Sequence, residues 1–241
     1  YGPAPPAPPI DYFEHWRAEC ALADRIVVNS QWSCEAVARA GIDRAKLHVI
    51  PLVYEPPAGE TPPARTFPDR FTAQRPLRLV FVGSASVVKG APQLLEAMTV
   101  LGDLPVTLRM VGEPGMTIPG SFLTHPAIEW VGAVPRGDIA RYYETSDVLV
   151  FPSHSDGFGM AQIEAQGYRL PVIASRCCGS VVRDGVNGLL LPEVTAPAIA
   201  AAVRAVVGRP DLLSGFSANA VPPGAGGLGA LGSELVQLVT F

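Results

Sequence analysis

Charged residues and cysteines are scarce in this sequence, and long apolar runs are absent. Only 17% of the 241 residues are charged and the net charge is −4, so the charge balance gives no reason to expect a nucleic acid partner. No apolar run reaches the length of a membrane span, and no signal peptide opens the sequence. The four cysteines lack the spacing of metal ligands, which favours reduced thiols, no metal site and a cytoplasmic location.

Two further patterns are missing. No Gly-x-Gly-x-x-Gly motif follows the strand predicted at Leu77, which argues against a dinucleotide-dependent oxidoreductase. His15, His48 and His125 are scattered along the chain and form no catalytic group. The sequence does have a hydrophobic content of 48%, which is enough for a sizeable core in a chain of this length.

Proline and glycine mark the segments that we expect to lie outside the folded elements. Residues 1–9 are rich in Pro and Ala, which predicts polyproline II or disorder. Residues 55–76 contain six prolines and few apolar side chains, which predicts a linker over 56–76. Residues 214–232 are rich in Gly, Ala and Pro and are predicted to be poorly ordered, before a short terminal helix over 233–240.

Strands alternate with helices along most of the chain, and this alternation predicts an α/β fold with a doubly wound parallel sheet. The carboxyl ends of such strands bind ligands, so three loops are candidates for a site: 83–90, 111–115 and 152–159. A shorter series precedes them, with a helix over 30–40 that Ser30 caps. The strands are expected at 25–29, 46–50, 77–82, 106–111, 128–131, 147–151, 171–174 and 189–191, and the later helices at 91–101, 135–145, 160–168 and 196–207.

The stretch 151–164 is the strongest candidate for a functional site. A strand ends there in a loop with Gly157 and Gly159 and opens a helix, an arrangement whose free N–H groups and dipole favour a phosphate. Asp156 and Glu164 add two carboxylates, whose negative charge suits hydroxyl groups better than phosphates. Asp156 is explained equally well as the N-cap of the helix. His154 reads as a polar loop residue, and Phe158 as packing against the sheet.

Several motifs in one order resemble a known family. The sequence reads Phe81-Val-Gly-Ser with Lys89-Gly, then Asp156-Gly-Phe-Gly with Glu164-Ala, then Leu170-Pro-Val-Ile-Ala and Asp184-Gly-Val-Asn-Gly-Leu-Leu. These motifs resemble the C-terminal half of retaining glycosyltransferases, in particular of glycosyltransferase family 4, which have the GT-B fold of two facing Rossmann-like domains. The resemblance is strong over 77–207, and residues 24–50 are similar to the end of the family's N-terminal half. It implies four segments: 1–55 from the end of the N-terminal domain, a linker at 56–76, a donor-binding domain at 77–210, and a tail at 211–241.

The resemblance also implies roles for single residues. Asp156 would contact the hydroxyls of the donor sugar and Glu164 the nucleotide ribose, while Lys89 would neutralise the departing diphosphate. Lys89 and Asp156 would therefore be the catalytic residues. The donor would be bound by Gly83, Ser84, Lys89, Gly112, Glu113, Asp156, Gly157, Phe158, Gly159, Met160 and Glu164.

The implied activity is transfer of a sugar from a nucleotide-diphosphate sugar to an unknown acceptor, without cofactor or metal, since no Asp-x-Asp triplet of the metal-dependent type is present. Only the end of an N-terminal domain fits before residue 55. We therefore expect a fragment that binds nucleotide and catalyses little alone, with any membrane-peripheral role left to the missing domain.

The family's accompanying arginine has no counterpart at Ser84 or Val88. Its absence keeps open the alternative of a non-catalytic nucleotide-sugar-binding or interaction module. An epimerase of the same fold fits the motifs less well.

Overall fold

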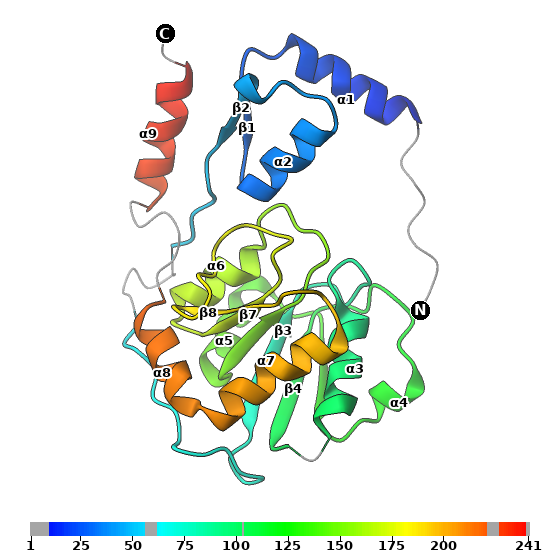
Figure 1. Cartoon of the computed structure of the whole chain (residues 1–241), viewed down its shortest axis with the longest axis vertical. Helices are drawn as coiled ribbons and strands as arrows, with labels where there is room; N and C mark the ends of the chain where they lie inside the picture. The colour runs from blue at the N-terminus through cyan, green and yellow to red at the C-terminus, as the bar shows by residue number, and fades with distance from the viewer. Residues whose placement is uncertain (1–9, 56–61, 103, 221–226, 240–241) are drawn as a thin grey trace.

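The computed structural model describes residues 10–55, 62–102, 104–220 and 227–239. They form two units that lie end to end (Figure 1): a smaller one made of residues 10–55 with the last helix, and a larger one made of residues 62–220. The expected segment 1–9 and the first part of the expected linker, 56–61, lie outside the described residues.

The larger unit is built on a parallel sheet whose strands lie in the order β5-β4-β3-β6-β7-β8. Within this unit the chain starts in the middle of the sheet, builds three strands outward to one edge, and then returns to build three toward the other edge. This is the strand order of a doubly wound, Rossmann-like sheet, so the predicted α/β fold is confirmed. The strands are β3 (Leu77–Val82), β4 (Val106–Val111), β5 (Ile128–Gly132), β6 (Val148–Phe151), β7 (Val172–Ala174) and β8 (Gly188–Leu190).

Helices cover both faces of this sheet because its strands are apolar on both sides. Along β3, Leu77, Leu79 and Phe81 belong to one core cluster, whereas Val80 and Val82 belong to the other. The first cluster contains buried residues of α3, α7 and α8, and the second contains residues of α5 and α6. These helices are α3 (Ala91–Leu101), α5 (Ala140–Thr145), α6 (Met160–Gly167), α7 (Ala196–Gly208) and α8 (Pro210–Ala218).

Two expectations about helices were wrong in detail. Residues 214–218 complete α8, which buries Leu213 and Phe216 in the core of the larger unit, and residues 227–232 are the first part of α9 (Gly227–Val239). The predicted poor order therefore does not hold for the described part of 214–232, because two apolar side chains one turn apart give α8 a buried face. The helix expected from Pro135 begins as a 3-10 turn, η2 (Arg136–Asp138), and becomes α-helical only in α5.

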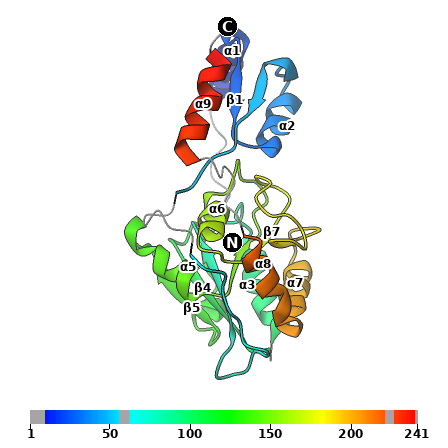
Figure 2. The same cartoon turned by 90° about the vertical axis from the view of Figure 1, so that its left-hand side faces the viewer.

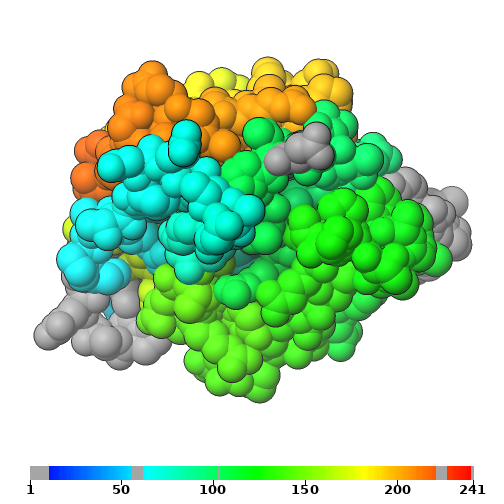
Figure 3. All heavy atoms as spheres, turned by 90° about the horizontal axis from the view of Figure 1, so that it is seen from below, coloured from blue at the N-terminus to red at the C-terminus, as the bar shows by residue number. Residues whose placement is uncertain are grey.

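The described part of the expected linker lies against the larger unit. The buried guanidinium of Arg65 donates to the backbone carbonyls of Tyr143, Glu144, Ser146 and Tyr168 at 2.7–3.2 Å. In Figure 3, which views the end of the sheet away from the smaller unit, the cyan surface of this segment lies beside the orange surface of α7 and α8. Five donors on one planar group let a single side chain hold the segment in place.

The smaller unit contains a two-stranded parallel sheet with a helix on each side. Figure 2 shows α2 and α9 on opposite sides of this sheet, so the chain returns to its first unit after completing the second. Ser30 caps α2 as predicted, since its hydroxyl accepts from the Ser33 amide at 3.0 Å. The elements are α1 (Ile10–Leu22), β1 (Ile26–Val28), α2 (Gln31–Arg39), η1 (Arg44–Lys46) and β2 (Leu47–Val49), and the larger unit also has the short helix α4 (Gly120–Leu123). None of the helices in the described ranges is both long and apolar enough to cross a bilayer.

Candidate functional site

The candidate site lies where the order in which the strands are added to the sheet reverses. β3 and β6 are neighbours, and the chain leaves them toward opposite edges of the sheet. At such a point the loops that follow the two strands diverge and leave a crevice at their carboxyl ends. These loops are 83–90 and 152–159, two of the three that the sequence singled out, and they face the smaller unit in Figure 1.

The two loops are joined directly. The carbonyl of Val88 accepts from the Ser153 hydroxyl at 3.1 Å and from the His154 amide at 2.8 Å. Gly90, which has φ of +69°, lies so close to Pro152 that a Cβ atom would overlap the Pro152 carbonyl oxygen. The glycine after Lys89 is therefore required by the close approach of two backbones.

Both carboxylate oxygens of Asp156 have partners in the protein. Its Oδ1 accepts from the amides of Phe158 at 3.2 Å and Gly159 at 3.0 Å, and its Oδ2 forms an ion pair with Lys89. The N-cap interpretation of Asp156 is wrong, because Gly159 is the N-cap of α6 and Asp156 accepts from the loop amides that precede the helix. The ammonium of Lys89 also lies 5.7 Å from the centre of the Phe151 ring, so the lysine is held at the crevice by a carboxylate and an aromatic face.

The loops after β3 and β4 continue side by side beyond the sheet. The Ala85 amide donates to the carbonyl of Glu113 at 2.9 Å, and the Gly115 amide donates back to Ala85 at 3.0 Å. A Cβ atom at Gly112 would overlap the carbonyl oxygen of Gly83, so these two glycines also allow a close approach. The structure therefore brings together four of the predicted residues: Gly83, Ser84, Gly112 and Glu113.

Glu164 lies on α6 and is held by a tyrosine. The hydroxyl of Tyr143 donates to Glu164 Oε2 at 2.7 Å, and the Tyr143 side chain is fully buried. Burial raises the pKa of Tyr143 well above its ordinary range, and the negative charge of Glu164 raises it further. The phenol therefore stays protonated and remains a donor throughout the physiological range.

The smaller unit contacts the 152–159 loop at Gly157. The carbonyl oxygen of Gly157 accepts from the Ser33 hydroxyl at 3.1 Å and from the Ser30 hydroxyl, both on the first turn of α2. Asn29 lies beside them, 3.4 Å from the position that a Cβ atom of Gly157 would take. The same loop is thus bound from the larger unit through Lys89 and from the smaller unit through α2.

The remaining residues of the loop have structural partners. Phe158 is buried against Ile163 and Val181, with Leu52 and Tyr54 packed on the same cluster, so its contacts are with the segment between the units more than with the sheet. His154 is exposed, as expected for a polar loop residue.

The two adjacent cysteines differ in exposure. Cys177 is half-buried, and its carbonyl accepts from the Asp156 amide at 3.0 Å. Cys178 is buried, and burial raises the pKa of its thiol to about 11. All four cysteines are free thiols.

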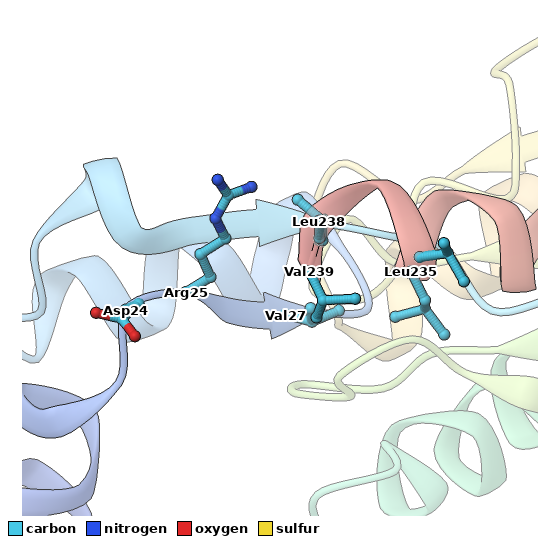
Figure 4. A pocket seen from close by; sticks show the side chains of 7 residues that line it. Asp24, Arg25, Val27, Leu235, Leu238 and Val239 are labelled. Carbon is cyan, nitrogen blue, oxygen red and sulfur yellow. The ribbon is translucent and has the colours of Figure 1, made fainter. Parts of the chain in front are cut away.

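A hollow of about 500 Å³ lies elsewhere, between β1 and α9 (Figure 4). Val27, Leu235 and Val239 contribute aliphatic side chains to it, and Asp24 and Arg25 lie at one end. A phosphate-bearing ligand needs converging donors, which the strand-end loops provide and these aliphatic side chains do not. Within the described ranges, no three His, Cys, Asp or Glu side chains are grouped so that they could hold a metal ion.

Sequence reasoning missed Tyr143, Ser30 and Ser33 as neighbours of the site. Tyr143 follows another tyrosine, and only burial distinguishes the two: Tyr142 is half-buried and its hydroxyl accepts from Arg141 at 2.9 Å. Ser30 was visible only as a helix cap and Ser33 was not singled out, because no local pattern tells that a helix N-terminus faces a loop more than 120 residues away.

Comparison with known proteins identifies the class. The family model for glycosyl transferases group 1 matches residues 76–209, which is more than half of the chain. The chain belongs to this family, and the predicted family is confirmed.

Two curated relatives are similar to this chain in sequence. The D-inositol 3-phosphate glycosyltransferase of Geodermatophilus obscurus is 33% identical over 80% of this chain and 48% of its own length. The protein of the same name from Actinosynnema mirum is 31% identical over 83% of this chain and 53% of its own length. The chain thus spans about half the length of the curated relatives it matches.

Solved structures show the same fold. HepE of Anabaena, crystallised with UDP and glucose, superposes with a TM-score of 0.75 at 18% identity, over 94% of this chain and 67% of HepE. Sucrose-phosphate synthase of Thermosynechococcus elongatus superposes with a TM-score of 0.74 at 25% identity, over 95% of this chain and 60% of the synthase. The fold is that of GT-B glycosyltransferases.

Proposed function

We propose that the larger unit binds a nucleotide-diphosphate sugar and that the chain serves the transfer of this sugar to an acceptor with retention of configuration. The observation that carries the proposal is the convergence of Lys89 with the amides of Phe158 and Gly159 on one carboxylate, that of Asp156. A cation and two loop amides that bind a carboxylate at the switch point of the sheet, just before the N-terminus of α6, offer the same donors to a phosphate.

The chemistry of transfer explains why these groups are needed. The bond between the sugar's anomeric carbon and the diphosphate oxygen breaks, and the electron pair leaves with the diphosphate. The oxygen of the acceptor hydroxyl bonds to the same face of the sugar, and its proton passes to the departing diphosphate. Negative charge grows on the leaving diphosphate in the transition state. Lys89 and the first turn of α6 stabilise that charge, since both point at the place where it develops.

The donor's other parts are assigned to the remaining predicted residues. Glu164 accepts from the ribose hydroxyls, Gly112 and Glu113 line the place of the base, and Gly83 and Ser84 border the diphosphate. Asp156 contacts the sugar hydroxyls once a diphosphate has taken its place on Lys89. Residues 77–210 would then be the donor-binding domain and residues 1–55 the end of the acceptor-side domain.

Calorimetric titration with UDP, GDP, ADP and CDP, without added metal, tests donor binding. UDP is the first probe because the similar protein HepE was crystallised with it. We expect saturable binding of one nucleotide that is lost in Lys89→Ala and in Glu164→Ala. The control variant Arg204→Ala removes a positive charge from α7, where that arginine donates to the Val100 carbonyl, and should bind as the wild type does. Absence of binding at millimolar nucleotide would reject the proposal.

A second candidate is a nucleotide-sugar-binding module without catalysis. The lack of an arginine at Ser84 and Val88 favours it. A transfer assay with UDP-glucose tests the module, with D-inositol 3-phosphate as the first acceptor because two relatives carry its name. We expect little turnover from this chain alone, and robust turnover would exclude the module.

A further inference from the structure

Tyr143 contacts the predicted ribose ligand from inside the protein. Its hydroxyl donates to Oε2 of Glu164 at 2.7 Å, and its ring has no exposed surface, although Glu164 itself is half-buried. Among the described residues, no hydrogen bond reaches Oε1, the second oxygen of the carboxylate. One oxygen is therefore fixed by the protein, and the other is available to a ligand.

The tyrosine is itself held from several sides. Its ring stacks on that of Tyr168, with centroids 5.6 Å apart and planes at 26°. The ring of Tyr168 also contacts the ring of Tyr54, which lies in the segment between the two units. Arg65 donates to the backbone carbonyls of Tyr143 at 2.7 Å and of Tyr168 at 2.9 Å. The phenol oxygen is thereby fixed by ring packing and by backbone hydrogen bonds.

The direction of the hydrogen bond matters for a hydroxyl ligand. A carboxylate on an α-helix can rotate about its side-chain torsions, and fixing it in one orientation on ligand binding costs conformational entropy. A donor that already holds one carboxylate oxygen removes part of that cost and aims the remaining lone pairs. A neutral phenol does so without cancelling the negative charge that makes the carboxylate a strong acceptor.

We propose that Tyr143 is a positioning residue, whose hydroxyl orients the Glu164 carboxylate to accept from the ribose hydroxyls of the nucleotide. This inference rests on the proposed function of the site, since it concerns how Glu164 recognises the donor. It predicts that Tyr143 contributes to selection for a ribose and does not contribute to the affinity for the diphosphate.

The test compares UDP with its dideoxy analogue, which lacks both ribose hydroxyls, on the wild-type chain and on Tyr143→Phe. That substitution removes the hydroxyl and keeps the ring stacked on Tyr168. We expect the affinity for UDP to fall about 3- to 10-fold while that for the dideoxy analogue stays unchanged, the range that corresponds to one hydrogen bond. Glu164→Gln should lose most of the preference for UDP.

Tyr142→Phe is the matched control, because it removes the hydroxyl of the neighbouring tyrosine, whose partner is Arg141. It should keep the wild-type preference for UDP. Thermal unfolding of each variant establishes that it is folded. If Tyr143→Phe keeps the wild-type preference and only lowers the melting temperature, Tyr143 is a packing residue and the inference is wrong. A wild-type chain that binds both nucleotides equally would overturn the inference alone, whereas one that binds neither would overturn the proposed function as well.

Discussion

Asp156 binds, with its two carboxylate oxygens, the groups that a diphosphate would need. Lys89 pairs with one oxygen, and the amides of Phe158 and Gly159 donate to the other. Oxygens of a carboxylate and of a phosphate accept similar hydrogen bonds, so under the proposed function a bound diphosphate would displace this side chain from Lys89. The free energy of that displacement is subtracted from the affinity for the nucleotide.

Replacing Asp156 by Asn should therefore strengthen the binding of bare UDP, by about 3- to 10-fold if the ion pair contributes on the order of 1 kcal/mol. The amide oxygen of Asn can still accept from the Phe158 and Gly159 amides but carries no charge to hold Lys89. UDP-glucose should gain less than UDP, because the predicted contact between Asp156 and the sugar is weakened at the same time. Calorimetric titration of both ligands measures the difference.

Glu193→Gln serves as the control for net charge, since it also removes one negative charge from an exposed position beside Thr195. It should leave both affinities unchanged. Weaker binding of UDP to Asp156→Asn would show that the carboxylate assists the nucleotide instead of competing with it.

Asp147 is a buried carboxylate that stabilises the fold through two arginines. Its side chain is 3% exposed and binds Arg75 at 2.7 and 2.8 Å and Arg78 at 2.9 and 3.0 Å. Burial alone would raise the pKa of Asp147, but the hydrogen bonds from Arg75 and Arg78 together lower it below its ordinary value. This lowered pKa means that the folded state binds the proton less tightly than the unfolded state does.

The stabilisation from Asp147 should thus be complete above its unfolded pKa of about 4 and be lost as the pH falls through the lower folded pKa. Asp147→Asn should lower the free energy of unfolding by about 3 kcal/mol at pH 7. It should also flatten the decline in stability below about pH 4. Urea unfolding across this pH range measures both effects.

Asp211→Asn is the comparison for this prediction, because the Asp211 carboxylate pairs with Arg209 in full contact with solvent. Its loss should leave the acid decline as it is in the wild type, since water and salt screen the pair. An Asp147→Asn variant with a decline as steep as the wild type's would contradict the assignment of that decline to Asp147.

Helix α2 connects the two units through its first turn. Ser30 caps the helix and donates to the Gly157 carbonyl, and Ser33 donates to the same oxygen at 3.1 Å. One turn of helix is therefore stabilised and docked by the same pair of hydroxyls. The contact places the smaller unit against the loop that we assign to the donor.

Removing both hydroxyls, in Ser30→Ala with Ser33→Ala, should cost about 1 kcal/mol of stability through the lost cap. It should also speed amide hydrogen exchange in the 152–159 loop, because the Gly157 carbonyl loses both donors. Thr195→Ala is the matched control: Thr195 caps α7, and its hydroxyl accepts from the Ala198 amide at 3.4 Å. That variant should lose stability without faster exchange in the loop. Equal exchange in both variants would mean that the serines do not hold the loop.

The strands of the larger unit and most of its helices could be predicted from the sequence, but the elements that they pack against could not. The strand 147–151 was expected from five nearly all apolar residues, and β6 occupies 148–151. The apolar run identifies a strand buried on both faces, because each face of a doubly wound sheet is covered by helices. For α8 the prediction was wrong, because Gly and Pro between 214 and 232 outweighed the buried positions of Leu213 and Phe216.

The whole molecule is a chain that passes through the smaller unit, builds the larger one and returns. Helix α9 lies beside β1, and the Leu228 amide on its first turn donates to Glu55 Oε1 at 2.9 Å. Glu55 and the first turn of α9 are therefore in contact. The packing of the smaller unit buries Cys20 and Cys34.

Cysteine reactivity reports on this packing. Cys20, Cys34 and Cys178 are buried, whereas Cys177 is half-buried. With a pKa of about 11, the Cys178 thiol is ionised in only about one molecule in a thousand at pH 8. Iodoacetamide at pH 8 should therefore label Cys177 first in the native chain and all four cysteines after unfolding in guanidinium chloride, as measured by mass spectrometry. Labelling of Cys20 or Cys34 as fast as Cys177 would show that the smaller unit opens while the larger one stays folded.

The strands in their order along the chain and the candidate loops could be read from the sequence alone, because apolar runs and glycines act over short distances along the chain. The family, and with it the predicted roles of Lys89, Asp156 and Glu164, followed from motifs that are also short stretches of sequence. Tertiary structure alone decided that Asp156 pairs with Lys89, that Tyr143 holds Glu164, and that α2 docks on Gly157. These contacts join residues 21 to 127 positions apart, and they depend on which strands become neighbours at the switch point of the sheet. No local sequence pattern specifies contacts between residues so far apart, so only the tertiary structure shows them.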